Sequence, residues 1–172
     1  VGFAFGGGSN PPLFWGELFR TTDGGITWDS LYSSSPDFNI TAASFVHMDT
    51  GYVFMTPETI LYTDNGGSTW TDVSSPIQMG PVYDCAFLNS RYGYAITSTG
   101  VIYKTLDGVN WNFEYSVPNT VLSSIDIIDS TAYVVGNDGT ILKNEGLVTG
   151  WEEIDKVGSL ILSPNPTSGL VS

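Results

Sequence analysis

Four tryptophans recur along the chain at nearly constant spacing, at positions Trp28, Trp70, Trp111 and Trp151. The intervals between them are 42, 41 and 40 residues. A fixed period of this length is typical of repeat proteins, in which each unit buries its apolar faces only against neighbouring units. We therefore expect a row of similar modules rather than one irregular core.

Three short sequence elements recur within the repeats. The first lies directly before the tryptophan and reads FRTTDGGITW (19–28), LYTDNGGSTW (61–70), YKTLDGVNW (103–111) and, in degraded form, ILKNEGLVTGW (141–151). The second places an aromatic residue after a small residue, in GFAF (2–5), GYVF (51–54), GYAI (93–96) and AYVV (132–135). The third precedes the second and reads ASFVHMD, YDCAFLN and SSIDIID. Because the first repeat lacks this third element, we expect the chain to begin within a repeat.

The composition of the repeats predicts strands. Runs rich in Val, Ile, Tyr, Phe and Thr alternate with Gly, Asp, Asn, Ser and Pro, and no segment has sustained helical periodicity. Four strands in about 40–45 residues match the strand number and length of one propeller blade. The sequence therefore predicts an all-β propeller of four-stranded antiparallel blades, with three full blades and one partial blade from a larger propeller. The expected blades span about 1–39, 40–79, 80–118 and 119–157.

Two aromatic positions have predicted packing roles. The aromatic residue of the second element is expected to pack between adjacent sheets. In the four repeats this residue is Phe3, Tyr52, Tyr94 and Tyr133 in turn. The recurring tryptophan is expected to hold the outermost strand against its own blade.

The first element resembles the Asp-box, or bacterial neuraminidase repeat, with the pattern S/T-x-D-x-G-x-T-W. The matching residues are Thr21, Asp23, Gly25, Thr27 and Trp28 in the first copy; Thr63, Asn65 in place of Asp, Gly67, Thr69 and Trp70 in the second; Thr105, Asp107, Gly108 and Trp111 in a shortened third; and Trp151 in the fourth. The resemblance covers about residues 1–155. Such repeats occur in sialidases, xyloglucanases, sortilin-type receptors and photosystem II assembly propellers. The resemblance implies that the boxes lie at the blade periphery, away from the central ligand face, and have a structural role.

The physical role expected of the Asp-box is that of a turn. A short carboxylate such as Asp23 accepts hydrogen bonds from the backbone of its own turn, and Asn65 is expected to replace it only in part. Gly24 and Gly25 supply the positive φ angles that the turn requires. No D-x-D-x-D-G pattern of a calcium loop is present, so no metal site is assigned.

After Lys156 the repeat ends, and residues 158–172 read as a linker or as a sorting signal. The segment SPNPTSG resembles the start of the C-terminal sorting domain of type IX secretion cargo in Bacteroidetes, through Pro164, Asn165, Pro166 and Gly169 after an apolar run at Leu160–Leu162. The resemblance implies recognition by the type IX secretion machinery. It also implies a location outside the cell or on the outer cell surface.

Charge and residue types exclude several functions. With 18 Asp and Glu against 5 Lys and Arg, the net charge of −13 excludes nucleic-acid binding and disfavours anionic membranes. No run of 18 apolar residues is present, so no membrane span is expected. Cys85, the only cysteine, is expected to be buried and inert, and His47 to be an ordinary strand residue. No cofactor motif is present, and none is expected.

We favour a recognition or scaffolding module that binds a glycan or a surface protein. Its ligand face is expected at the loops that join the second strand to the third and one blade to the next. The longest such loop is expected at Gly6–Glu17, with Phe14 and Trp15 exposed, although both residues fit the start of a strand equally well. The other candidate ligand-face residues are Asp37, Glu58 and Asp138.

Two alternatives remain at this stage, a glycoside hydrolase and a structural spacer. Sialidase resemblance implies an arginine triad, but the sequence holds only Arg20 and Arg91. A xyloglucanase-like site needs two carboxylates across a cleft, and the spacing identifies no pair. We therefore assign no catalytic residue, and catalysis by this segment is disfavoured.

Overall fold

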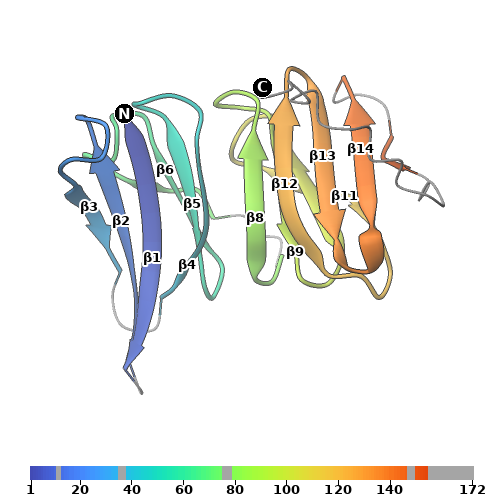
Figure 1. Ribbon diagram of the computed structural model, residues 1–172, viewed down its shortest axis with the longest axis horizontal. Helices are drawn as coiled ribbons and strands as arrows, with labels where there is room; N and C mark the ends of the chain where they lie inside the picture. Colours follow the sequence, from blue (N-terminus) through green and yellow to red (C-terminus); the bar gives the residue numbers. More distant parts are fainter. Residues whose placement is uncertain (11–12, 35–37, 75–78, 147–149, 155–172) are drawn as a thin grey trace, which may run out of the picture.

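The computed structural model describes residues 1–10, 13–34, 38–74, 79–146 and 150–154. These residues form strands and one short 3-10 turn, arranged as four antiparallel sheets. Figure 1 shows the sheets side by side in sequence order, from the blue β1 to the orange β14. The predicted all-β propeller fold is confirmed, and the partial blade is the first, since its sheet has three strands and each of the others has four.

Each sheet is a meander in which consecutive strands pair. The first sheet contains β1 (Gly2–Asn10), β2 (Leu13–Thr21) and β3 (Asp29–Ser33). The second contains β4 (Ile40–Phe45), β5 (Gly51–Met55), β6 (Thr59–Thr63) and β7 (Thr71–Asp72). The third contains β8 (Val82–Phe87), β9 (Gly93–Thr97), β10 (Val101–Thr105) and β11 (Trp111–Ser116). The fourth contains β12 (Leu122–Ile128), β13 (Thr131–Gly136), the 3-10 turn η1 (Asn137–Gly139), β14 (Ile141–Glu145) and β15 (Glu152–Glu153).

The core is divided into three apolar clusters, each between neighbouring sheets. Three of the four predicted aromatic residues, Phe3, Tyr52 and Tyr94, pack against the sheet that follows their own, whereas Tyr133 belongs to none of the clusters between described sheets. Phe3 stacks on Phe45 with ring centroids 3.6 Å apart, and Tyr52 stacks on Phe87 at 4.1 Å. The small residue before the aromatic is explained within the sheet, because Gly51 pairs with Phe45 on the neighbouring strand and a Cβ atom at Gly51 would overlap the ring of Phe45. The small residue thus makes room for a ring of its own sheet, and the aromatic residue packs against the next sheet.

The tryptophans occupy the same place in each repeat, next to the outermost strand, but they do not simply hold that strand to its own sheet. Trp111 lies edge-on to Phe54 of the preceding sheet and is 1% exposed. Trp70 and Trp151 likewise contact Tyr32 and Tyr94, each in the preceding sheet. No described sheet precedes the first, and Trp28 is accordingly 45% exposed. The expected contact with the tryptophan's own blade is also present, from Trp111 to Phe87 and from Trp70 to Phe45, so the tryptophan packs on its own blade and in addition joins it to the one before.

The glycine-rich segment Gly6–Glu17 is not the loop that the sequence suggested. Its described residues belong to β1 and β2, which pair from Gly2 opposite Thr21 to Asn10 opposite Leu13. The glycines permit close approach within the hairpin, because a Cβ atom at Gly8 would overlap the indole of Trp15. Trp15 and the backbone of Phe14 therefore belong to a strand, which was the alternative interpretation.

Two further residues complete the comparison with the sequence predictions. Cys85 lies in β8 and is 5% exposed, as expected. His47 was predicted to be a strand residue, but it lies in the bend after β4 and is exposed. The bend is held by a hydrogen bond from the backbone N–H of Thr50 to the carbonyl of His47, 3.3 Å long.

Candidate functional site

The ends of the sheets form two different surfaces. At one end, which we call the pocket end, lie the turns between second and third strands and the connections between sheets. Backbone hydrogen bonds join these two kinds of segment, from Thr56 to Asn39 (2.9 Å) and from Asn137 to Val121 (3.0 Å). At the other end, the Asp-box end, lie the Asp-boxes and the turns between first and second strands. In Figure 1 the η1 turn marks the pocket end, at the bottom of the view.

The first Asp-box is a self-contained hydrogen-bonded turn. Asp23 accepts hydrogen bonds from the backbone N–H of Thr27 (3.0 Å), its hydroxyl (2.7 Å) and the hydroxyl of Thr21 (2.8 Å). The hydroxyl bond from Thr27 is the first of several that hold the pKa of Asp23 well below its usual range. Gly24 and Gly25 have φ angles of 77° and 93°, as the turn requires. Every one of these polar contacts of Asp23 is directed to its own turn.

Sequence reasoning missed the role of the threonine that opens each box. The hydroxyl of Thr21 accepts a hydrogen bond from the backbone N–H of Gly25 at 2.8 Å. Thr63 does the same for Gly67 at 2.9 Å, and Thr105 for Gly108 at 2.9 Å. The S/T position of the motif was the available signal, since a hydroxyl both donates and accepts.

The second and third boxes replace parts of this network. Asn65 was expected to replace aspartate only in part. It accepts hydrogen bonds from the backbone N–H of Thr69 (2.9 Å) and from Thr63 (3.1 Å), and its amide donates to the hydroxyl of Thr69 (2.7 Å). Asn65 therefore keeps all the equivalent partners, because an amide both donates and accepts. In the shortened third box Asn110 takes the threonine place and lowers the pKa of Asp107 to about 2.

Hydrogen bonds at the Asp-box end also join neighbouring sheets. Arg20 donates from Nη1 to the carbonyl of Gly66 in the next box, at 3.0 Å. Tyr52 donates to the carbonyl of Ser90 in the next sheet at 2.8 Å, and desolvation raises its pKa to about 12. The Asp-box end is therefore a structural surface.

The pocket end contains a hollow between the second and third sheets. The lining residues are Thr41, Phe54, Met55, Glu58, Thr59, Ile60, Met79, Gly80 and Val82. The empty space amounts to about 290 Å³, part of which is open to solvent. The hollow is a partly open depression and not an enclosed cavity, so it is suited to contact with a side chain of a larger partner rather than to enclosure of a whole small ligand.

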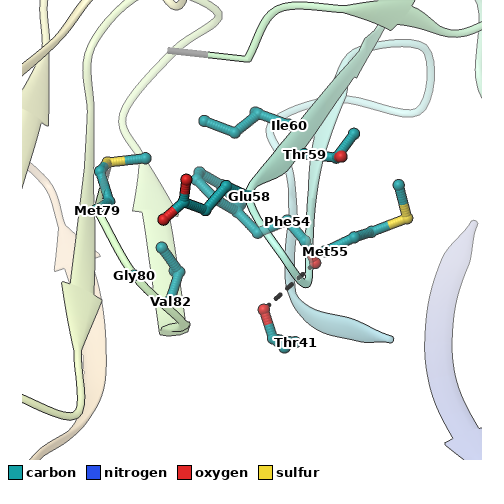
Figure 2. Close-up of a pocket in the computed structure, with 9 residues that line it drawn as sticks. All are labelled: Thr41, Phe54, Met55, Glu58, Thr59, Ile60, Met79, Gly80 and Val82. Atoms are coloured by element: carbon teal, nitrogen blue, oxygen red, sulfur yellow. Dashed lines mark hydrogen bonds between the residues drawn. The ribbon is translucent and has the colours of Figure 1, made fainter. Parts of the chain in front are cut away.

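Glu58 is the only charged residue in the lining. It lies in the turn between β5 and β6 and is exposed. Figure 2 shows its carboxylate directed toward the side of the pocket formed by Met79, Gly80 and Val82. Across the pocket Thr41 donates a hydrogen bond to the carbonyl of Phe54, at 3.4 Å. The lining is thus apolar except for two threonines and one carboxylate.

The other sequence-predicted site residues do not join this pocket. Trp15 is 38% exposed on β2, and the side chain of Phe14 lies outside the described structure. Asp138 is exposed in η1 with a φ angle of 56°. Asp37 and the sorting-signal residues Pro164, Asn165, Pro166 and Gly169 lie outside the described residues. The structure therefore unites none of the predicted ligand-face residues, and only Glu58 lines a pocket.

The described residues contain neither a cluster of metal ligands nor a membrane-spanning helix. No group of three or more His, Cys, Asp or Glu in this part of the chain is placed to hold a metal ion. Within the same ranges, no helix has the length and apolar character needed to span a membrane.

Comparison with known proteins gives a family and several solved structures. Residues 15–134 match the family model described as photosynthesis system II assembly factor YCF48. The structure of YCF48 bound to D1 peptide is similar, with a TM-score of 0.61 and 26% identity over 82% of this chain and 50% of that chain. YCF48 from Cyanidioschyzon merolae has a TM-score of 0.54 and 20% identity over 66% of this chain and 36% of that one.

A glycoside hydrolase propeller shares the fold. The GH74 enzyme of Niastella koreensis has a TM-score of 0.60 and 14% identity over 81% of this chain and 26% of that chain. The present chain thus spans half of the length of the first YCF48 chain and a quarter of the length of the enzyme. Comparison with curated proteins gives no significant match.

Proposed function

Since this chain belongs to the photosynthesis system II assembly factor YCF48 family, we propose that it is a recognition module that binds a peptide segment of a partner protein at its pocket end. The observation that carries the proposal is the similar solved structure, in which YCF48 is bound to D1 peptide. The match to the family model covers most of this chain and includes every residue that lines the pocket.

The shape and chemistry of the pocket support a peptide over a glycan. A pocket for one side chain, at the junction of two rigid sheets, is how protein partners are usually anchored. Phe54 is the only aromatic residue in the lining and is 2% exposed, so the pocket offers no open ring face on which a sugar could stack. A peptide side chain inserted between the sheets is therefore the better fit.

The glycoside hydrolase alternative is less well supported. The likeness to the GH74 enzyme lies at 14% identity and concerns the fold alone. Glycoside hydrolysis uses two carboxylates about 5–10 Å apart, whereas Glu58 is the single carboxylate of the pocket lining. The pocket as described therefore favours binding.

The cellular place of the module is a second part of the proposal. Residues 163–169 resemble a type IX sorting signal, and we place the module outside the cell or on the outer surface on that ground. Addition of protease to intact cells of the source organism should remove the protein, while a periplasmic marker survives. Replacement of Pro164, Asn165 and Pro166 by alanine should abolish this sensitivity. Protection of the natural protein in intact cells would contradict the surface location.

The binding proposal is tested by selection of random peptides displayed on phage against the immobilised 172-residue chain. We expect a family of enriched peptides whose binding is lost in the Glu58→Phe variant, because the side chain of Glu58 is directed into the pocket and phenylalanine there would cover it. Thr99→Phe is the matched control, since Thr99 is exposed in the β9–β10 turn as Glu58 is exposed in the β5–β6 turn but lies outside the lining. Absence of enrichment, or equal loss in both variants, would refute the proposed site.

A further inference from the structure

The position of Glu58 carries an inference that goes beyond peptide binding in general. Its side chain projects from the β5–β6 turn into the mouth of the pocket (Figure 2). Among the described residues it forms no hydrogen bond and no ion pair, and no Lys, Arg or His lines the pocket. An unpaired carboxylate thus stands at the edge of a hollow whose apolar walls are the side chains of Phe54, Ile60, Met79 and Val82.

We propose that this pocket receives a lysine or arginine side chain of the bound peptide, whose methylene groups contact Met79 and the neighbouring apolar side chains and whose charge pairs with Glu58. The inference rests on the proposed function and names the partner chemistry of the same site. Long basic side chains bury an apolar stem while their charged end stays near water or a counter-ion. The lining offers both requirements in one place, with Met79, Ile60 and Val82 for the stem and Glu58 for the charge.

The other side-chain classes fit the pocket less well. A purely apolar side chain would cover Glu58 and take water from its carboxylate without a new partner, which is unfavourable. An acidic side chain would meet a like charge directly. A basic side chain also gains from the whole molecule, because a net charge of −13 attracts cationic ligands at long range.

The three methionines of the chain provide a direct test by NMR. The side chain of Met79 lines the pocket, whereas that of Met55 packs between the first and second sheets and Met48 is 60% exposed in the bend after β4, at the Asp-box end. The full chain, labelled with ¹³C in its methionine methyl groups, is titrated with end-blocked alanine–glycine peptides that carry lysine, arginine, norleucine or glutamate at the centre.

We expect the lysine and arginine peptides to shift the Met79 methyl signal at millimolar concentration and to leave Met48 and Met55 unchanged. Norleucine has a similar stem without the charge and should bind more weakly, and glutamate should cause no shift. The Glu58→Gln variant should lose about threefold to tenfold in affinity for the lysine peptide, as for a partly exposed ion pair. Higher salt should weaken binding to the natural chain more than binding to this variant.

Asp138→Asn is the matched control, since it removes one negative charge at the pocket end but outside the pocket lining. Equal effects of Glu58→Gln and Asp138→Asn, or equal shifts with lysine and norleucine, would overturn the inference. Peptides selected from the display library without a required basic residue would also overturn it, while the proposed function would stand. Failure of the library to enrich any peptide would instead count against the proposed function.

Discussion

Trp111 and Trp28 hold equivalent places in two repeats but differ in burial, and this difference predicts unequal effects of the same substitution. Trp111 is 1% exposed and lies edge-on to Phe54 and Phe87, whereas Trp28 is 45% exposed. Replacement of Trp111 by alanine removes a wholly buried ring and leaves a cavity between two sheets. The equivalent change at Trp28 removes a ring that is already half in water.

The magnitudes follow from the buried area. An aromatic side chain that buries about 150–250 Å² contributes about 4–6 kcal/mol at 25 cal/mol per Å². Measured truncations of buried Phe or Trp to Ala cost about 3–5 kcal/mol. We therefore expect Trp111→Ala to lower the free energy of unfolding by about 4 kcal/mol. We expect Trp28→Ala to lower it by about 1–2 kcal/mol, because half of the area is exposed and no closed cavity forms.

Urea unfolding measures this difference. With a denaturant slope of about 2 kcal/mol per M, the midpoint should fall by about 2 M for Trp111→Ala and by less than about 1 M for Trp28→Ala. Far-UV circular dichroism and tyrosine fluorescence should be followed together, because repeat arrays can unfold in more than one step. Trp111→Phe serves if the alanine variant does not fold, with Trp28→Phe as its control. Equal midpoint shifts for the two positions would refute the idea that the tryptophan acts on the preceding sheet.

Three other experiments test the packing and the electrostatics. Gly93→Ala should lower the free energy of unfolding by about 1–3 kcal/mol, because its Cβ would overlap the ring of Phe87. Addition of Phe87→Leu should recover part of the fall in the urea midpoint. Strictly additive losses in the double variant would contradict this explanation. The pKa of Asp107 is lowered to about 2 in the folded chain, so its contribution to stability is present above about pH 4 and is lost as pH falls toward 2. The urea midpoint of the Asp107→Asn variant should therefore depend less on pH over that range than the midpoint of the natural chain, and an unchanged pH profile would exclude this role. Burial raises the pKa of the Cys85 thiol, so a thiol reagent should react with it only after unfolding, and rapid labelling of the native chain would contradict the burial.

Local sequence was sufficient to predict the repeat architecture because each sheet is formed by consecutive strands. The spacing of the tryptophans and the small-then-aromatic element report contacts between neighbouring units, so Phe3 and Tyr52 could be placed between sheets from their pattern alone. The Asp-box turns were also predictable in outline, since Asp23 bonds to residues at most four positions away.

Prediction failed for the glycines of the first hairpin and for the threonine that opens each Asp-box, because both residue types have more than one physical role. Gly6–Gly8 suggested a loop, although here the missing side chains make room for Trp15 across a hairpin. The pocket was only partly predictable. Glu58 could be chosen from its turn, but Met79 and Thr41 reach it from other strands and connections through the packing of two sheets. Such contacts leave no periodic signal in the sequence.

The reach of Trp70, Trp111 and Trp151 into the preceding sheet has a consequence for how such an array can change in evolution. The interface between two blades depends on the indole, whereas the carboxylate serves its own turn. The two parts of the motif are thus free to drift at different rates. The fourth repeat illustrates this, because its Asp-box is degraded while Trp151 remains 8% exposed against Tyr94. A duplicated unit that keeps the indole and the small-then-aromatic pair therefore keeps the residues that contact neighbouring blades, even when its Asp-box turn is incomplete.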